Sequence, residues 1–183
     1  VLSDLIAQTF DPSYITVVEG DKTVAQELLQ QKFDHIFYTG GSAVGKIVMK
    51  AAAEHLTPVT LELGGKSPCL VEPDIHVEHS AKRIIWGKFI NAGQTCIAPD
   101  YLLVHRSIKE ELVQAIKAGL KEFYGENPAE SSDYARIVSE RHFNRLREFL
   151  DNGKIIAGGE TNAEPRYIAP TLLEAVSGED PVM

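Results

Sequence analysis

The stretch Ile36-Phe37-Tyr38-Thr39-Gly40-Gly41-Ser42-Ala43-Val44-Gly45 decides the fold class, because it leads from an apolar run through glycines into a helical pattern. Residues 36–38 predict a strand, and the glycines that follow predict a tight turn. The predicted helix carries apolar residues on one side, namely Val44, Ile47, Val48 and Ala51. A strand that turns into a helix in this way is typical of α/β proteins.

The residues on either side continue the alternation of strands and helices. Residues 15–18 predict an earlier strand, and a helix is expected after Thr23, with Thr23 and Gln26 spaced as a capping box. Residues 59–63 predict a third strand. This order of elements predicts a parallel, doubly wound sheet.

Gly64 and Gly65 interrupt the pattern, and we place a domain boundary there. Beyond it, strands are predicted at 68–71, 101–104 and 154–157. One predicted helix is capped by Asp74 and carries Trp86, which we interpret as a core residue.

Two more helices are predicted in this second part. One is begun by Ser107 and Glu110 as a capping box, and the other carries Phe143, Leu146 and Leu150 on its apolar face.

The composition narrows the classes of partner. The chain has 18 basic and 26 acidic residues, a formal charge of −8 that argues against nucleic acid or an anionic membrane as partner. No apolar run reaches the roughly 18 residues that a membrane-spanning helix needs. The two cysteines, Cys69 and Cys96, do not form a disulfide framework, so a reducing, cytoplasmic setting is expected. The six histidines have no metal-ligand spacing, and no metal site is predicted.

The glycine turn Gly40–Gly45 is the first candidate site. Such a turn lets backbone N–H groups and a helix N-terminus approach a phosphate. With Lys46 the turn nearly matches a P-loop, but Ile47 stands where that motif requires Ser or Thr. The alternative is a tight turn with Ser42 as helix cap.

Glu62 is the second candidate, because it ends an apolar strand just before the paired glycines. Ligands of open α/β sheets bind at the carboxyl ends of the strands. We expect a partly desolvated carboxylate there that acts as a general base on water. The alternative is a strand-end glutamate paired with Lys66.

Cys96 is the third candidate, because it follows a long predicted helix in the polar segment Asn91-Ala92-Gly93-Gln94-Thr95. A thiol there can act as a nucleophile, and the backbone N–H groups beside it can stabilise an oxyanion. A lone cysteine is, alternatively, a small buried hydrophobe. Cys69 fits that alternative and is assigned no role.

Taken in this order, three stretches resemble the aldehyde dehydrogenase superfamily. The first, residues 37–46, is similar to its cofactor-binding turn, and the second, Leu61-Glu62-Leu63-Gly64-Gly65-Lys66-Ser67-Pro68, to its glutamate signature. The third, residues 87–101 around Cys96, resembles its cysteine signature and is most similar to the class 3 branch, which acts on fatty and aromatic aldehydes. Residues 121–125 and 167–171 extend the resemblance along the chain.

The resemblance implies a role for each candidate. Residues 1–63 would be the C-terminal part of a Rossmann-like NAD(P)-binding domain, and residues 64–183 the N-terminal part of an α/β catalytic domain. Cys96 would form a thiohemiacetal and then a thioester with the aldehyde, and Glu62 would activate the hydrolytic water. The residues expected beside NAD or NADP are Gly40, Gly41, Ser42, Ala43, Val44 and Gly45. A homodimer acting on medium to long aliphatic or aromatic aldehydes is implied.

Some family features are not found in this sequence. Related proteins often place Asn or Ser at Gly41, and the family's oxyanion-hole asparagine motif is not recognisable. We therefore expect an internal fragment that is inactive alone. The alternatives are a non-catalytic binding or assembly module and a relative that transfers the acyl group instead of hydrolysing it.

Overall fold

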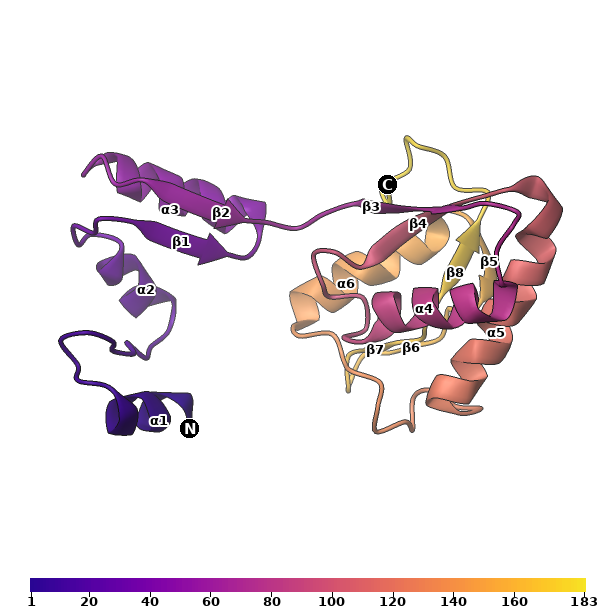
Figure 1. Cartoon of the computed structure of the whole chain (residues 1–183), viewed down its shortest axis with the longest axis horizontal. Helices are drawn as coiled ribbons and strands as arrows, with labels where there is room; N and C mark the ends of the chain where they lie inside the picture. The colour runs from indigo at the N-terminus through magenta and orange to yellow at the C-terminus, as the bar shows by residue number, and fades with distance from the viewer. The chain divides into compact units, whose positions relative to one another are not determined.

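The computed structural model describes residues 1–183 and contains two compact units, Val1–Leu63 and Gly64–Met183. The division between them follows β2, at the paired glycines where the sequence places a boundary (Figure 1). The assignment of the first unit as NAD(P)-binding and the second as catalytic stays a prediction.

The first unit is built around a parallel pair of strands. β1 (Ile36–Thr39) pairs with β2 (Val59–Glu62) in parallel, in a register that runs from Ile36 opposite Val59 to Thr39 opposite Glu62. Helix α3 (Ser42–Ala53) connects the two strands and lies along the pair, with Val48 and Ala52 buried (Figure 1). The predicted strand–turn–helix–strand order and the parallel pairing are confirmed here.

The N-terminal part of this unit differs from the prediction. It contains α1 (Leu2–Thr9) and α2 (Lys22–Leu28), but residues 15–18 form no strand. Ile15, Val17 and Val18 are 43%, 38% and 55% exposed. An apolar run becomes a strand only when a neighbouring strand pairs with its backbone groups, and here none does.

Helix α2 also begins differently from the prediction. Its cap is Asp21, whose Oδ1 accepts hydrogen bonds from the backbone N–H of Thr23 at 2.8 Å and of Val24 at 3.4 Å. The predicted Thr23–Gln26 capping box is wrong, because a carboxylate two residues earlier already satisfies these N–H groups.

The second unit combines a parallel pair with antiparallel pairs. β3 (Ser67–Val71) pairs with β4 (Pro99–Val104) in parallel, whereas β5 (Lys154–Ala157) with β8 (Leu172–Glu174) and β6 (Thr161–Asn162) with β7 (Tyr167–Ile168) are antiparallel. Its helices are α4 (Val77–Phe89), η1 (Arg106–Ile108), α5 (Lys109–Tyr124), α6 (Glu140–Glu148) and η2 (Phe149–Asp151). Together the two units form a mixed α/β fold, as predicted.

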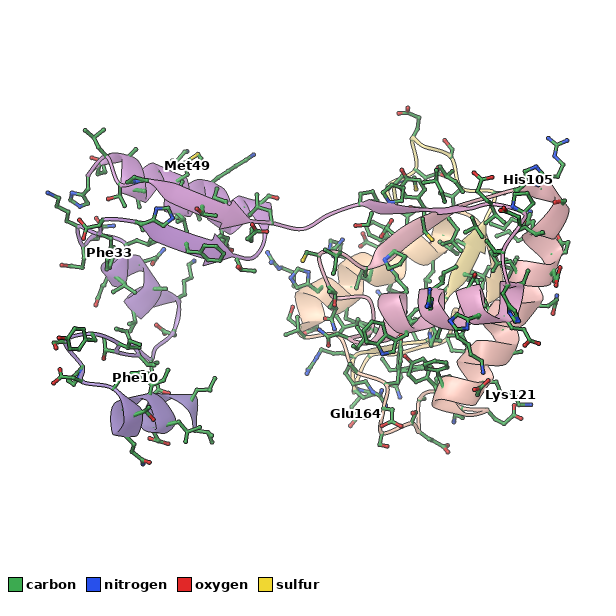
Figure 2. All side chains as sticks on the ribbon, viewed as in Figure 1. Phe10, Phe33, Met49, His105, Lys121 and Glu164 are labelled. Carbon is green, nitrogen blue, oxygen red and sulfur yellow. The ribbon has the colours of Figure 1, made fainter.

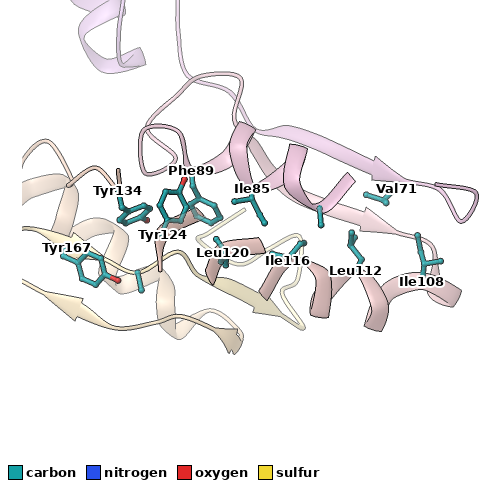
Figure 3. Close-up of a cluster of buried hydrophobic side chains, with 12 residues drawn as sticks. Val71, Ile85, Phe89, Ile108, Leu112, Ile116, Leu120, Tyr124, Tyr134 and Tyr167 are labelled. Atoms are coloured by element: carbon teal, nitrogen blue, oxygen red, sulfur yellow. The ribbon is translucent and has the colours of Figure 1, made fainter. Parts of the chain in front are cut away.

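The core of the second unit lies where α4 packs against α5 (Figure 3). Ile85 and Leu112 are almost fully buried between these helices. At one end of the cluster the aromatic rings of Tyr124, Tyr134 and Tyr167 pack edge to face, with centroids 5.0 and 6.0 Å apart. The C-terminal half of the unit is therefore attached to the helix pair through aromatic contacts.

Two predicted helix caps in this unit are wrong, because histidine rings occupy the capping positions. The cap of α4 is His76 instead of Asp74; its Nδ1 accepts from the N–H of His79 at 3.4 Å. His105 stands at the start of η1 (Figure 2) and accepts from the N–H of Ser107 at 3.3 Å, so Ser107 and Glu110 form no capping box.

The interpretation of Trp86 as a core residue is also wrong. Its side chain is 60% exposed, because Ala81, Ile85 and Phe89 form the buried stripe of α4 and Trp86 lies beside that stripe.

Candidate active site

The glycine turn and Glu62 lie together at one edge of the first unit. Thr39, the last residue of β1, is paired with Glu62, the last residue of β2. The next residue, Gly40, donates its backbone N–H to the carbonyl oxygen of Glu62 at 3.0 Å. This edge is formed by the carboxyl ends of parallel strands, which is where α/β sheets bind their ligands.

The turn leads into α3 without a side-chain cap. Gly41 is the capping residue in an extended conformation, and its carbonyl accepts from the N–H groups of Val44 and Gly45 at 3.1 and 3.0 Å. Ser42 is already the first helical residue, so the alternative in which its side chain caps the helix is wrong. The backbone N–H groups of Ser42 and Ala43 therefore have no partner within the helix and can donate to an anionic ligand.

Gly45 allows α3 to approach β2 closely. A Cβ atom at this position would lie 3.0 Å from Cδ2 of Leu63 and 3.8 Å from Cδ1 of Leu61. The backbone of the turn is thus held directly above the end of the strand that carries Glu62.

The Glu62 side chain itself is exposed within this chain, so the predicted partial desolvation is not seen. Lys66, the alternative partner proposed for it, instead forms an ion pair with Asp100 at 2.8 Å. A second lysine, Lys88, lies 3.6 Å from the same carboxylate.

Cys96 lies in a tight, irregular segment that follows α4. Ala92 and Gly93 have φ angles of 50° and 79°, which reverse the chain direction after the helix. Turn hydrogen bonds follow, from the N–H of Gln94 to Asn91 at 3.0 Å and from that of Ala98 to Thr95 at 3.1 Å. The backbone therefore presents Cys96 at the surface of the unit.

The environments of the two cysteines differ. Cys96 is exposed, whereas Cys69, in β3, is half-buried, and burial raises the pKa of its thiol. The alternative of a small buried hydrophobe thus fits Cys69 and does not fit Cys96.

Two contacts hold the Cys96 segment, residues 91–98, and neither was predicted from the sequence. The carbonyl oxygen of Cys96 lies against Gly65, whose Cβ, if present, would be 2.6 Å away. The side chain of Gln94 is hydrogen-bonded to residues more than 40 positions further along the chain. The only sequence feature that pointed to a role for Gln94 was its position two residues before Cys96.

Glu62 belongs to the first unit and Cys96 to the second. No group of three or more His, Cys, Asp or Glu side chains is arranged to hold a metal ion. None of the helices combines the length and the apolar character needed to cross a membrane.

Known proteins resemble the chain over its full length. The dimeric NADP-preferring aldehyde dehydrogenase of Rattus norvegicus is 52% identical over 183 residues, which is 100% of this chain and 40% of the relative. Aldehyde dehydrogenase family 3 member A2 of the same species is also 52% identical over 183 residues, 100% of this chain and 38% of that protein. The chain thus spans about two-fifths of the length of these relatives.

A solved structure agrees with the sequence comparison. The substrate-bound state of Staphylococcus aureus AldH matches 100% of this chain and 40% of its own, at 47% identity and with a TM-score of 0.90. The class 3 resemblance is confirmed by the name of the family 3 relative. Because the sequence profile of the aldehyde dehydrogenase family matches residues 1–183, the chain belongs to that family.

Proposed function

We propose that this chain is part of a longer NAD(P)-dependent aldehyde dehydrogenase, in which Cys96 is the nucleophile and Glu62 the general base. The observation that carries the proposal is the exposed Cys96, held in a tight turn within a chain that belongs to the family throughout.

The reaction would begin at the Cys96 sulfur. Its thiolate adds to the carbonyl carbon of the aldehyde, which forms a carbon–sulfur bond and leaves the negative charge on oxygen. The backbone N–H of Cys96 has no hydrogen-bond partner within the chain and is free to donate to this oxyanion. Loss of hydride from the same carbon then leaves a thioester on Cys96.

Glu62 would complete the cycle. Its carboxylate takes a proton from water, the hydroxide adds to the thioester carbon, and the carbon–sulfur bond breaks to give the carboxylic acid and the Cys96 thiolate, after which Glu62 releases its proton to solvent. The exposure of Glu62 at the end of β2 leaves its carboxylate accessible to water. An acyl-transferring relative would have less use for such a base.

The first unit would hold the dinucleotide, which when bound supplies the hydride acceptor. The turn Gly40–Gly45 fits this role, because Gly41 has no side chain and nothing lies within 4 Å of its Cβ position. The free N–H groups of Ser42 and Ala43 are suited to a phosphate. NADP is the cofactor in the name of one relative, and we propose NAD or NADP here.

The same relative is named as dimeric, and we propose a homodimer for the longer protein. We also propose an aliphatic or aromatic aldehyde as substrate, which the class 3 relationship supports. The free thiols of Cys69 and Cys96 support the proposal of a reducing, cytoplasmic setting.

A direct test compares the 183-residue chain with a polypeptide of the relatives' full length. Reduced cofactor is measured with octanal or benzaldehyde and with NAD or NADP. We expect turnover by the long protein, none by the chain alone, and loss of turnover in Cys96→Ser. Cys69→Ser is the matched control and should retain activity.

The two alternatives give different results in the same assay. A long protein that binds the cofactor stoichiometrically without turnover would favour the binding module. Turnover that requires an added thiol acceptor would favour the acyl-transferring relative. Activity of the 183-residue chain alone would contradict our expectation that further parts are needed.

A further inference from the structure

The side chain of Gln94 connects the Cys96 segment to a distant part of the second unit. Its Nε2 donates to the carbonyl oxygen of Arg136 at 3.1 Å and to that of Asn91 at 3.1 Å. Its Oε1 accepts from the backbone N–H of Val138 at 2.9 Å. Both ends of one amide are therefore used, within two residues of Cys96.

The amide is matched to its partners in chemistry as well as distance. Two carbonyl oxygens face the nitrogen end of Gln94 and one N–H faces the oxygen end. A carboxylate of the same shape would place negative charge against two acceptors, and an apolar side chain would leave all three groups without their partner.

The segment that Gln94 binds is itself fixed to the core. The Arg136 guanidinium donates to the carbonyl oxygen of Tyr134 at 2.7 Å and lies 5.1 Å above the Tyr167 ring. Arg166 exchanges two hydrogen bonds with Ile137, at 2.9 and 3.0 Å. Gln94 is thus bound to a segment that has its own hydrogen bonds to the C-terminal part of the unit.

The Cys96 segment has little other support. Ala92 is a non-glycine residue with φ of 50°, a conformation that persists only where the surroundings impose it. The backbone hydrogen bonds within the segment close local four-residue turns. Besides the close approach of Gly65 to the Cys96 carbonyl, the amide bridge is the hydrogen-bonded contact that ties these turns to another part of the chain.

We infer that Gln94 is a positioning residue for the nucleophile: its amide fixes the Cys96 segment to the Arg136–Val138 backbone, and so fixes the direction of the thiol. This inference rests on the proposed function for its catalytic consequence only; the bridge itself is testable without turnover. Gln94 acts through the backbone of the Cys96 segment and not on the reacting atoms.

The test uses the full-length protein with Gln94→Met and Gln94→Glu. The matched controls are Gln114→Met and Gln114→Glu, at an exposed position of α5 whose side chain makes no hydrogen bond. A displacement of the thiol by about 1 Å reduces kcat by roughly 100-fold, and we expect a loss of this order in both Gln94 variants. KM should change less than about threefold, because Gln94 contributes no binding contact.

The bridge is measured separately by amide hydrogen exchange at Val138. Gln94→Met should accelerate this exchange by at least about tenfold, since the N–H loses its acceptor. Gln94→Glu keeps an acceptor for this N–H and should accelerate the exchange less than Gln94→Met does. The amide of Ile137, bonded to Arg166, is the internal reference and should not change.

The outcomes separate this inference from the proposed function. Fast exchange at Val138 in the folded wild type, or wild-type kcat in both Gln94 variants, would overturn the positioning role. An inactive wild type would overturn the proposed function while the exchange measurement still decides the bridge. If Gln94→Met does not fold, Gln94→Glu and the wild-type exchange rate decide alone.

Discussion

The carbonyl oxygen of Cys96 occupies the space that a side chain on Gly65 would need. A Cβ atom on Gly65 would lie 2.6 Å from this oxygen, closer than any carbon–oxygen contact tolerates. The opposing atom belongs to the backbone, so it cannot move away by a rotamer change. Gly65 and the Cys96 segment are thus packed directly against each other.

Gly65→Ala should therefore displace the Cys96 segment. We expect kcat to fall by roughly 10- to 100-fold, as for a misplacement of the nucleophile by up to about 1 Å. Gly64→Ala is the matched control, because nothing lies within 4 Å of its Cβ position, and it should stay within about twofold of the wild type. Equal activity of the two variants in the aldehyde assay would contradict the close packing.

Cys96 should react with iodoacetamide before Cys69. Cys96 is exposed, whereas Cys69 is half-buried and its thiol has a raised pKa because burial disfavours the thiolate. The difference should narrow as the pH rises, because more Cys69 thiolate forms. Peptide mass mapping after partial labelling at several pH values measures both rates. Faster labelling of Cys69 at neutral pH would disprove the assignment of environments.

Gly45→Val should weaken cofactor binding by at least about tenfold. The new side chain would collide with Leu63, only 3.0 Å from the Cβ position, and push the N-terminal turn of α3 away from the strand edge. Ala53→Val adds a similar bulk at an exposed position of the same helix and should leave the Kd unchanged. Titrations with NADH and NADPH, followed by fluorescence, compare the two variants.

Tyr134 should contribute to stability through its buried hydroxyl. Its side chain is 5% exposed and donates to the carbonyl oxygen of Ile168 at 3.1 Å. Tyr134→Phe should lower the free energy of unfolding by about 1 kcal/mol. Tyr14→Phe, at a position 87% exposed, should have no effect. Urea titrations of the wild type and both variants measure this effect. A midpoint for Tyr134→Phe equal to that of the wild type would argue against the buried hydrogen bond.

Because of Tyr134, the free energy of unfolding should decrease at high pH. Burial raises the pKa of Tyr134 well above its ordinary value. The unfolded chain then loses the phenolic proton at a lower pH than the folded one, so stability is complete below about pH 10 and falls above it. The slope of unfolding free energy against pH should be smaller in Tyr134→Phe. If the slope in Tyr134→Phe equals that of the wild type, the loss of stability at high pH comes from other groups.

Local sequence patterns determined much of the fold. The apolar run at 36–38, the glycine turn and the helical period after it are short-range features, and the structure has β1, the turn and α3 at these positions. The placement of Glu62 beside Gly40 follows from them, because parallel strands end at a common edge. The segment that carries Cys96 was identified by its motif.

Local patterns did not predict which residue caps each helix or whether the apolar run at 15–18 forms a strand. Several polar side chains near a helix start are able to cap it, and the one whose backbone is extended at that point does so, as with Asp21 and His76. The apolar run at 15–18 forms no strand because pairing depends on a partner strand.

The contacts that hold Cys96 come from the packing of distant segments. A cysteine after the long helix, within a family-specific motif, can be identified from the sequence alone, but Gln94 reaches Arg136 and Val138 across 42 and 44 positions of the chain. The approach of Gly65 to the Cys96 carbonyl likewise joins segments from two strand ends. Contacts of this kind arise from the packing of α4, α5 and the aromatic cluster, which brings distant backbone groups within hydrogen-bonding distance, and no periodic pattern along the chain encodes them.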